Sequence, residues 1–93
     1  MRVVNLTSMT ATSQVFHDSG EVGFVYHETE ILTKLPGGRI RLNSGGFETP
    51  TTKKRINSFL PLGWQVIQRN FKWYVRTPAG EDIPFVDGLV LNT

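Results

Sequence analysis

The chain has 93 residues, a formal net charge of +2 and no cysteine. That length suits one domain with one modest core, and a content of 39% hydrophobic and 11% aromatic residues excludes a disordered chain. The absence of thiols excludes disulfides, thiolate catalysis and Cys-ligated zinc, and no apolar run reaches the roughly 18–20 residues of a membrane span. We therefore expect a single cytosolic domain over residues 1–93 that makes no membrane contact.

The first half of the chain is predicted to be mostly β-strand. Residues 1–14 contain a short strand at 3–6 and a Ser/Thr-rich stretch at 7–14, which we expect to be a flexible segment or a loop. Residues 14–17 and 22–26 have the β-branched and aromatic content of strands. Residues 30–43 are predicted to form a β-hairpin, because Pro36-Gly37-Gly38 is typical of a turn and Ile40 and Leu42 alternate with arginines.

One short helix is predicted at about residues 50–60. Thr49 is a suitable N-cap, and Pro50 fits the first helical position, where its missing N–H costs nothing. Pro61 and Gly63 end the helix. The residues expected to face the core form one apolar stripe at helical spacing, namely Ile56, Phe59 and Leu60.

Strands are predicted again after the helix, at 64–69, 71–76, 82–86 and 89–91. Asn70 is the expected turn between the first two, and Pro84 puts the third at an edge of the sheet. In the strand at 71–76, alternation puts Phe71, Trp73 and Val75 on the core face. The predicted fold class is α+β, a small antiparallel β-sheet with one helix packed on it, in the order roughly β-β-β-α-β-β-β.

Charge is segregated along the chain. Residues 34–76 hold nine bases against Glu48 alone, a net charge of +8, whereas residues 1–33 and residues 77–93 each have a net charge of −3. A basic middle indicates a positive face that could meet phosphates. The alternative is that the acidic ends fold back and neutralise this middle.

Two parts of the basic middle form a candidate anion-binding surface. The helix start combines hydroxyls, free N–H groups and three consecutive cations, which suits a phosphate backbone. The hairpin after the helix has an aromatic side chain interleaved with bases on one strand face, as in single-strand binding proteins; the alternative is that the ring covers a core edge. The candidate nucleic-acid or anion-binding residues are Thr49, Thr51, Thr52, Lys53, Lys54, Arg55, Arg69, Lys72, Tyr74 and Arg76.

No catalytic, cofactor or metal motif is evident. The chain lacks a Gly-x-Ser-x-Gly turn and both Gly-rich nucleotide-binding patterns. His17 and His27 are ten residues apart and lack the spacing of paired metal ligands on one element. We expect no enzymatic activity, no cofactor and no metal.

Two segments, 26–31 and 40–57, resemble a group of short uncharacterised proteins of tailed bacteriophages. The second segment contains Asn-Ser-Gly-Gly-Phe-Glu followed by Thr-Pro-Thr-Thr-Lys-Lys-Arg-Ile-Asn. It is similar to that group's block Asn-Ser-Gly-Gly-aromatic-x-Thr-x-Thr-Thr-Lys-x-Arg-Ile/Met-Asn, with Phe47 where Trp is expected. The resemblance covers about a third of the chain. It implies a phage origin and action in the host cell cytoplasm, and it supplies no activity.

The sequence therefore predicts a small non-enzymatic phage accessory protein that binds an anionic partner through a basic face, with nucleic acid as the first candidate. The alternative is a protein–protein interaction module that binds an acidic host protein and modulates a host enzyme or defence complex. The sequence leaves the oligomeric state open.

Overall fold

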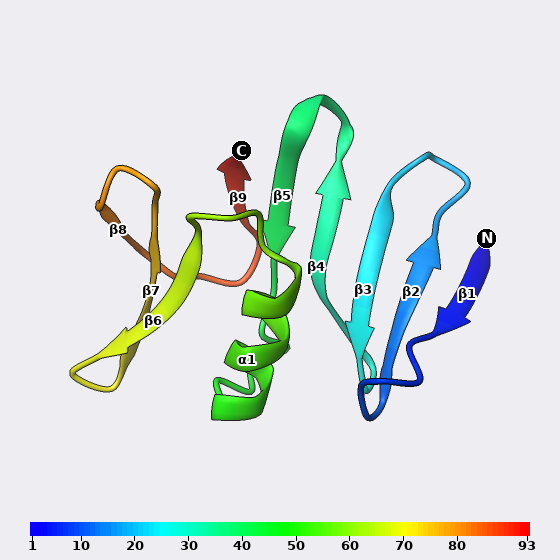
Figure 1. Ribbon diagram of the computed structural model, residues 1–93, viewed down its shortest axis with the longest axis horizontal. Coiled ribbons are helices and arrows are strands. Elements are labelled where there is room, and N and C mark those ends of the chain that lie inside the picture. Colours follow the sequence, from blue (N-terminus) through cyan, green and yellow to red (C-terminus); the bar gives the residue numbers. More distant parts are fainter.

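The computed structural model describes residues 1–93 and contains nine strands and one α-helix in two antiparallel sheets (Figure 1). The larger sheet has the strand order β1-β2-β3-β4-β5-β9, and the smaller has the order β6-β7-β8. The strands are β1 (Arg2–Asn5), β2 (Thr12–Phe16), β3 (Val22–Tyr26), β4 (Thr29–Leu35), β5 (Arg39–Leu42), β6 (Gln65–Arg69), β7 (Lys72–Arg76), β8 (Asp82–Pro84) and β9 (Leu89–Asn92).

Strands β1 to β5 follow one another across the larger sheet, so most of this sheet forms from neighbouring segments. The β4–β5 hairpin turns at Pro36–Gly38, where Gly37 has a φ of +79° that favours glycine. Ile40 and Leu42 are buried, as their alternation with arginines predicts. The last strand, β9, returns from the end of the chain and pairs with β5.

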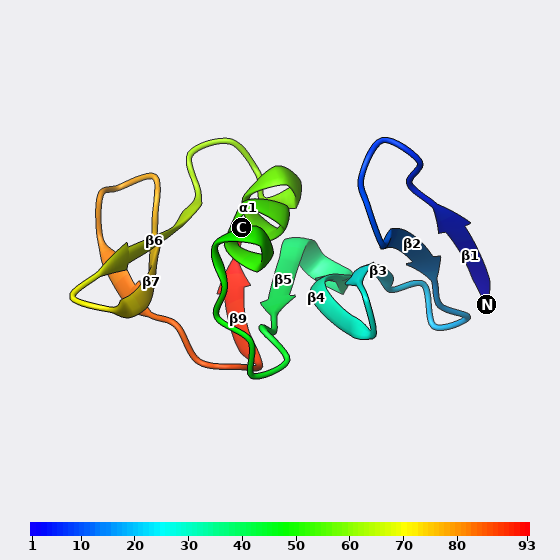
Figure 2. The same ribbon diagram turned by 90° about the horizontal axis from the view of Figure 1, so that it is seen from below.

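The helix α1 (Pro50–Phe59) begins where the sequence predicts, at the Thr49 N-cap. Ile56 is fully buried, and Phe59 stacks on Phe24 of β3 with ring centroids 4.0 Å apart. These contacts hold α1 against one face of the larger sheet (Figure 2). No helix in the chain is long and apolar enough to cross a lipid bilayer.

The expected arrangement in one sheet is wrong, because β6, β7 and β8 form a sheet of their own. The outer edge of β5 is paired with β9, so β6, β7 and β8 cannot pair with β5 there. The smaller sheet is instead fastened to the helix. The Asn57 side-chain amide donates to the Val66 carbonyl (3.1 Å), and its oxygen accepts from the Val66 N–H (2.7 Å). As expected, the Pro84 strand lies at a sheet edge.

The inner face of the β6–β7 hairpin is partly as predicted. Trp73 and Val75 are buried at 4% and 0% exposure. The assignment of Phe71 to the same face is wrong, because Phe71 is 94% exposed. The turn contains two residues, Asn70 and Phe71, both with positive φ, and β7 begins only at Lys72. Alternation therefore does not extend back to Phe71.

The hydrophobic core joins both sheets and the helix. Trp73 meets Phe85 edge-to-face, with ring centroids 5.3 Å apart. This arrangement confirms the α+β class with one short helix. The buried core residues are Phe24, Ile31, Leu32, Ile40, Leu42, Ile56, Val66, Trp73, Val75, Phe85 and Leu91.

Candidate functional site

The start of α1 is fixed by its own threonines. The Thr49 hydroxyl oxygen accepts the Thr52 N–H at 3.2 Å and lies 3.0 Å from the Thr52 hydroxyl. Thr52 is only 3% exposed, so it supports the helix start from inside. Thr51, by contrast, is exposed. Of the three predicted phosphate-contacting threonines, Thr49 and Thr52 therefore have a structural use already.

The three cations of α1 have no carboxylate within ion-pair distance. Lys54 is exposed, whereas Lys53 and Arg55 are half-buried. The Arg55 guanidinium lies 5.5 Å from the centre of the Tyr26 ring, and its Nε is buried without a hydrogen-bond partner. Lys53 and Lys54 are thus the more available pair, while Arg55 also packs against β3.

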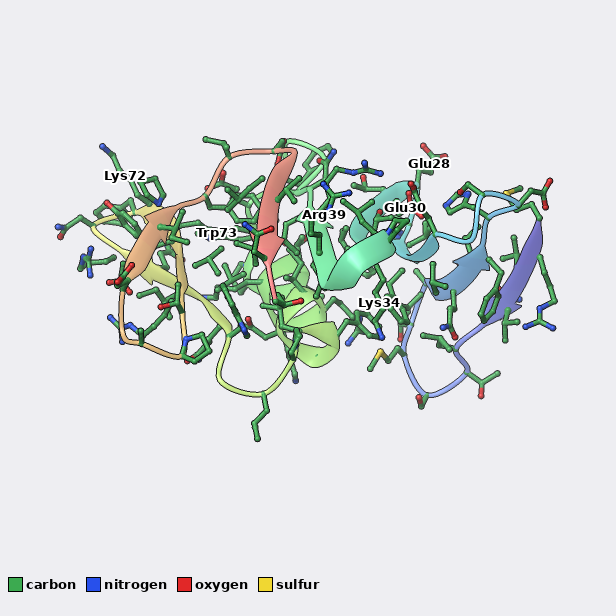
Figure 3. All side chains as sticks on the ribbon, turned by 90° about the horizontal axis from the view of Figure 1, so that it is seen from above. Glu28, Glu30, Lys34, Arg39, Lys72 and Trp73 are labelled. Atoms are coloured by element: carbon green, nitrogen blue, oxygen red, sulfur yellow. The ribbon has the colours of Figure 1, made fainter.

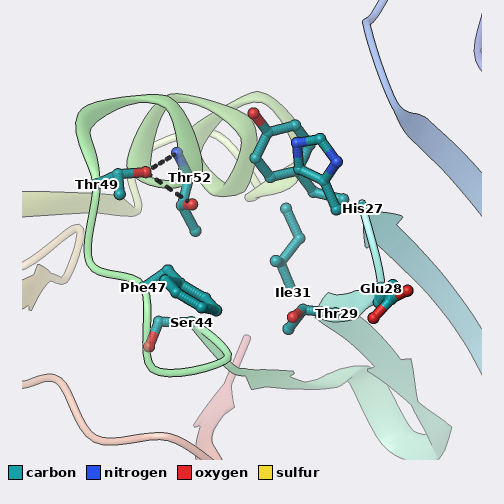
Figure 4. A pocket seen from close by; sticks show the side chains of 9 residues that line it. His27, Glu28, Thr29, Ile31, Ser44, Phe47, Thr49 and Thr52 are labelled. Carbon is teal, nitrogen blue, oxygen red and sulfur yellow. Dashed lines mark hydrogen bonds between the residues drawn. The ribbon is translucent and has the colours of Figure 1, made fainter.

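An open pocket of about 490 Å³ lies between the β3–β4 turn and the start of α1 (Figure 4). Figure 4 shows His27 on one side of the pocket, Phe47 on the other and Ile31 between them, and Tyr26 also lines the pocket. His27 occupies the turn with a φ of +55°. All lining residues fall within the two segments that carry the phage resemblance, and the remaining ones are Glu28, Thr29, Ser44, Thr49 and Thr52.

The loop before α1 is held in a defined shape. Asp87 Oδ1 accepts both the N–H and the hydroxyl of Ser44, each at 2.7 Å, although it lies 43 residues further along the chain. Gly45 has a φ of +67°, and a Cβ there would overlap the Thr29 side chain. Phe47 follows this fixed loop and is 69% exposed at the pocket. The Ser-Gly-Gly sequence therefore forms a fixed loop directly before the exposed Phe47 ring.

The second predicted cluster, on the β6–β7 hairpin, is different because both of its arginines share one carboxylate of the protein, which neutralises them in part. Asp82 of β8 bonds Arg69 Nη1 at 2.7 Å and Arg76 Nε at 2.8 Å. The Arg69 guanidinium also lies 4.6 Å from the centre of the Tyr74 ring, covering it. Lys72 alone among these residues has neither a carboxylate nor a ring partner, and Figure 3 shows it pointing away from the molecule.

Asp82 is the group whose ionisation responds most to this cluster. Hydrogen bonds from Arg76 and then Arg69 lower the pKa of Asp82 from 3.8 to about 2. In return, the hydrogen bond to Asp82 raises the pKa of each arginine. The carboxylate therefore stays charged and holds both arginines at any ordinary pH.

The acidic ends do fold back on the basic middle, but only in part. Besides the Asp82 cluster, Glu21 approaches Arg41 at 3.9 Å. The other cations of the middle have no ion-pair partner, and they are Lys34, Arg39, Lys53, Lys54, Arg55 and Lys72. Their positions show that the unpaired charge is concentrated on α1 and on two hairpin turns.

Three aromatic residues of the candidate surface are not indicated by the sequence, namely Tyr26, Phe47 and Phe71. Tyr26 and Phe47 become neighbours only when β3 and the loop before α1 meet, so no local pattern reveals the pocket. Alternation assigns Phe71 to the core, although a β-hairpin normally needs at least a two-residue turn and Asn70 alone cannot supply one.

Comparisons with known proteins place the chain in a phage family. Residues 4–92 match the family described as Kyanoviridae Gp96 protein, which supports the resemblance to short phage proteins. Comparisons with curated proteins and with solved structures gave no match. Because the match spans nearly the whole sequence, the chain belongs to the Kyanoviridae Gp96 protein family.

Proposed function

We propose that this protein is a non-enzymatic phage accessory protein that binds nucleic acid in the host cell cytoplasm. The proposed interface is the start of α1 together with the pocket beside it, and the favoured ligand is a single strand. Single-strand binding proteins combine cations that follow the phosphates with aromatic rings that stack on bases. Both groups are available at this place.

The main support is the unpaired charge on α1. Lys53 and Lys54 lack carboxylate partners, and they directly follow Thr52, which lines the pocket. When unpaired cations of a protein contact phosphates, they displace the counterions condensed on the nucleic acid. The release of these counterions is the main source of sequence-independent affinity. The arginines on β6 and β7 offer less, because Asp82 already neutralises them in part.

The pocket supports a ligand with flat apolar faces. Tyr26 and Phe47 both line it, and Phe47 is largely exposed. The hydroxyl of Thr29 and the ring nitrogens of His27 have no hydrogen-bond partner within the protein, although both residues line the pocket. A base could therefore stack on the exposed Phe47 ring and hydrogen-bond at its edges.

The deciding experiment is fluorescence anisotropy of labelled single- and double-stranded oligonucleotides at low and physiological salt. We expect salt-sensitive binding of the single strand. The double variant Lys53→Ala/Lys54→Ala should weaken this binding and reduce its salt slope by roughly 0.7 for each phosphate that the variant no longer neutralises. Arg55 is left in place because its stacking on Tyr26 gives it a structural use.

A matched control uses two other unpaired cations. Lys34 and Arg39 flank the β4–β5 turn, at the opposite end of the molecule from the start of α1 (Figure 1). The variant Lys34→Ala/Arg39→Ala removes the same charge and should retain most of the affinity. Equal losses in both variants would show that binding follows net charge and not the proposed interface. No binding at low salt would exclude nucleic acid as the ligand.

A protein partner is the second candidate, and strand β1 favours it. All four residues of β1 are exposed, including Val3 at 53% and Val4 at 39%. β1 lies at the edge of the larger sheet, where its unpaired N–H and C=O groups can accept an added strand. Affinity capture from host lysate, with Val3→Lys as the comparison, tests this candidate. A stable complex that Val3→Lys abolishes would support it.

A further inference from the structure

The turn between β6 and β7 has an unusual composition for its geometry. Asn70 and Phe71 have φ values of +52° and +63°, and the flanking Arg69 and Lys72 are directly paired across the strands. Two central residues with positive φ are the mark of a type I′ turn, which strongly prefers Asn-Gly. Asn tolerates this region, but a bulky side chain such as Phe is a conformational outlier there.

Nothing in the fold offsets this strain. Phe71 is 94% exposed, so it gains almost no burial, and it belongs to no aromatic pair. Glycine at this position would relieve the backbone and remove an exposed apolar ring. Strained residues of this kind persist where they serve binding or catalysis, and an observed outlier is a reason to look for such a role.

The surroundings of Phe71 identify the chemistry of its partner. Between Gln65 and Arg76 the hairpin has no acidic residue. Lys72, the next residue, projects freely (Figure 3), whereas Arg69 before the turn is held by Asp82 and covers the Tyr74 ring. An exposed apolar ring next to a free cation matches a ligand with flat faces and negative charge at regular intervals, which is a strand of unpaired bases.

We propose that Phe71 is a stacking anchor for an unpaired base of single-stranded nucleic acid, with Lys72 meeting the adjacent phosphate. This inference rests on the proposed function and extends its interface to a second element. Figure 1 shows the β6–β7 turn, the start of α1 and the β3–β4 turn along the same edge of the molecule, the lower one in that view. A strand that contacts the start of α1 can therefore follow this edge to Phe71.

The test compares Phe71→Gly, Phe71→Leu and Phe71→Trp in the anisotropy assay. Loss of one base–aromatic stack weakens binding by about 5- to 150-fold, and we expect this loss for Phe71→Gly. Phe71→Leu should lose a similar factor because it keeps the apolar volume but not the ring, and Phe71→Trp should bind at least as well as the wild type. Chemical denaturation should show that Phe71→Gly unfolds at a higher denaturant concentration, so weaker binding cannot result from misfolding.

The outcomes separate this inference from the proposed function. If the wild type binds and Phe71→Gly binds equally well, the anchor is wrong while the proposed function stands. If Phe71→Leu binds as tightly as the wild type, the ring does not stack on a base, which also overturns the inference. If the wild type binds no oligonucleotide at low salt, both fail together.

Discussion

The start of α1 and the β6–β7 hairpin show how equal numbers of cations can differ in what they offer to a ligand. Each region contributes three bases to the middle of the chain. On α1 all three lack a carboxylate partner, whereas Asp82 holds both hairpin arginines and leaves only Lys72 free. The net charge along the sequence therefore overestimates the positive charge that the hairpin can offer to a ligand. The available charge depends on the carboxylates of the neighbouring strand, β8.

The largest effect is expected at Trp73, whose buried side chain anchors the inner face of the β6–β7 hairpin in the core. Trp73→Ala should lower the free energy of unfolding by about 3–5 kcal/mol, because it leaves a cavity against Phe85 in the shared core. Urea denaturation measures the change. The control Leu62→Ala removes a fully exposed side chain and should change the stability by less than about 0.5 kcal/mol. A small effect for Trp73→Ala would mean that the hairpin is not anchored as described.

On the α1 side, Gly45 tests whether the loop before the helix is rigid. Gly45→Ala places a side chain at positive φ and also into the Thr29 side chain, so it should cost more than the roughly 1–2 kcal/mol of the conformation alone. Gly46→Ala is a matched control, because Gly46 also has a positive φ but no neighbour near its Cβ position. Denaturation of the two variants should rank Gly45→Ala as the less stable. Equal stabilities would indicate that the loop yields easily and does not fix Phe47.

The smallest expected effect comes from Asp82, and it should make the two regions more alike. Asp82→Asn frees Arg69 and Arg76, so binding of a single strand should strengthen by a few-fold, with a steeper salt dependence. Glu81→Gln removes the same charge next to Asp82 but breaks no ion pair. An equal gain in Glu81→Gln would contradict the idea that pairing, and not charge alone, limits the hairpin.

The same aspartate should make the folded protein less stable as the pH falls. Because the pKa of Asp82 is lowered from 3.8 to about 2 in the folded protein, its ion pairs stabilise the fold fully above the ordinary pKa. This stabilisation is lost as the pH falls from about 4 to about 2. Denaturation midpoints measured across this range should fall more steeply for the wild type than for Asp82→Asn.

Local signals in the sequence predict the helix and the β4–β5 hairpin well. Thr49-Pro50 defines the helix start through a cap that involves neighbouring residues only, and Pro36-Gly37-Gly38 does the same for the turn. The pairing of β5 with β9 depends on segments far apart in the chain, so no local pattern reveals it or the division into two sheets.

The candidate site is predictable only in outline for the same reason. The basic run on α1 is visible in the sequence, but the burial of Thr52 and the pocket beside Tyr26 depend on tertiary packing. Asp82 lies on the strand next to Arg76, so the neutralised arginines become apparent only once β7 and β8 are paired. Alternation misplaces Phe71 because it does not hold through a turn.

The return of β9 to β5 also has a consequence for the order in which the chain folds. The meander β1 to β5 can form from neighbouring segments. The outer edge of β5, however, is paired only when residues 89–92 reach it, and residues 43–88 form the intervening loop. Closing a loop of that length has an entropic cost that local hairpins avoid. During synthesis, β5 therefore emerges long before its partner and presents an open edge, to which another chain could add. Early formation of α1 over Phe24 would shield one face of the waiting sheet but leave that edge free.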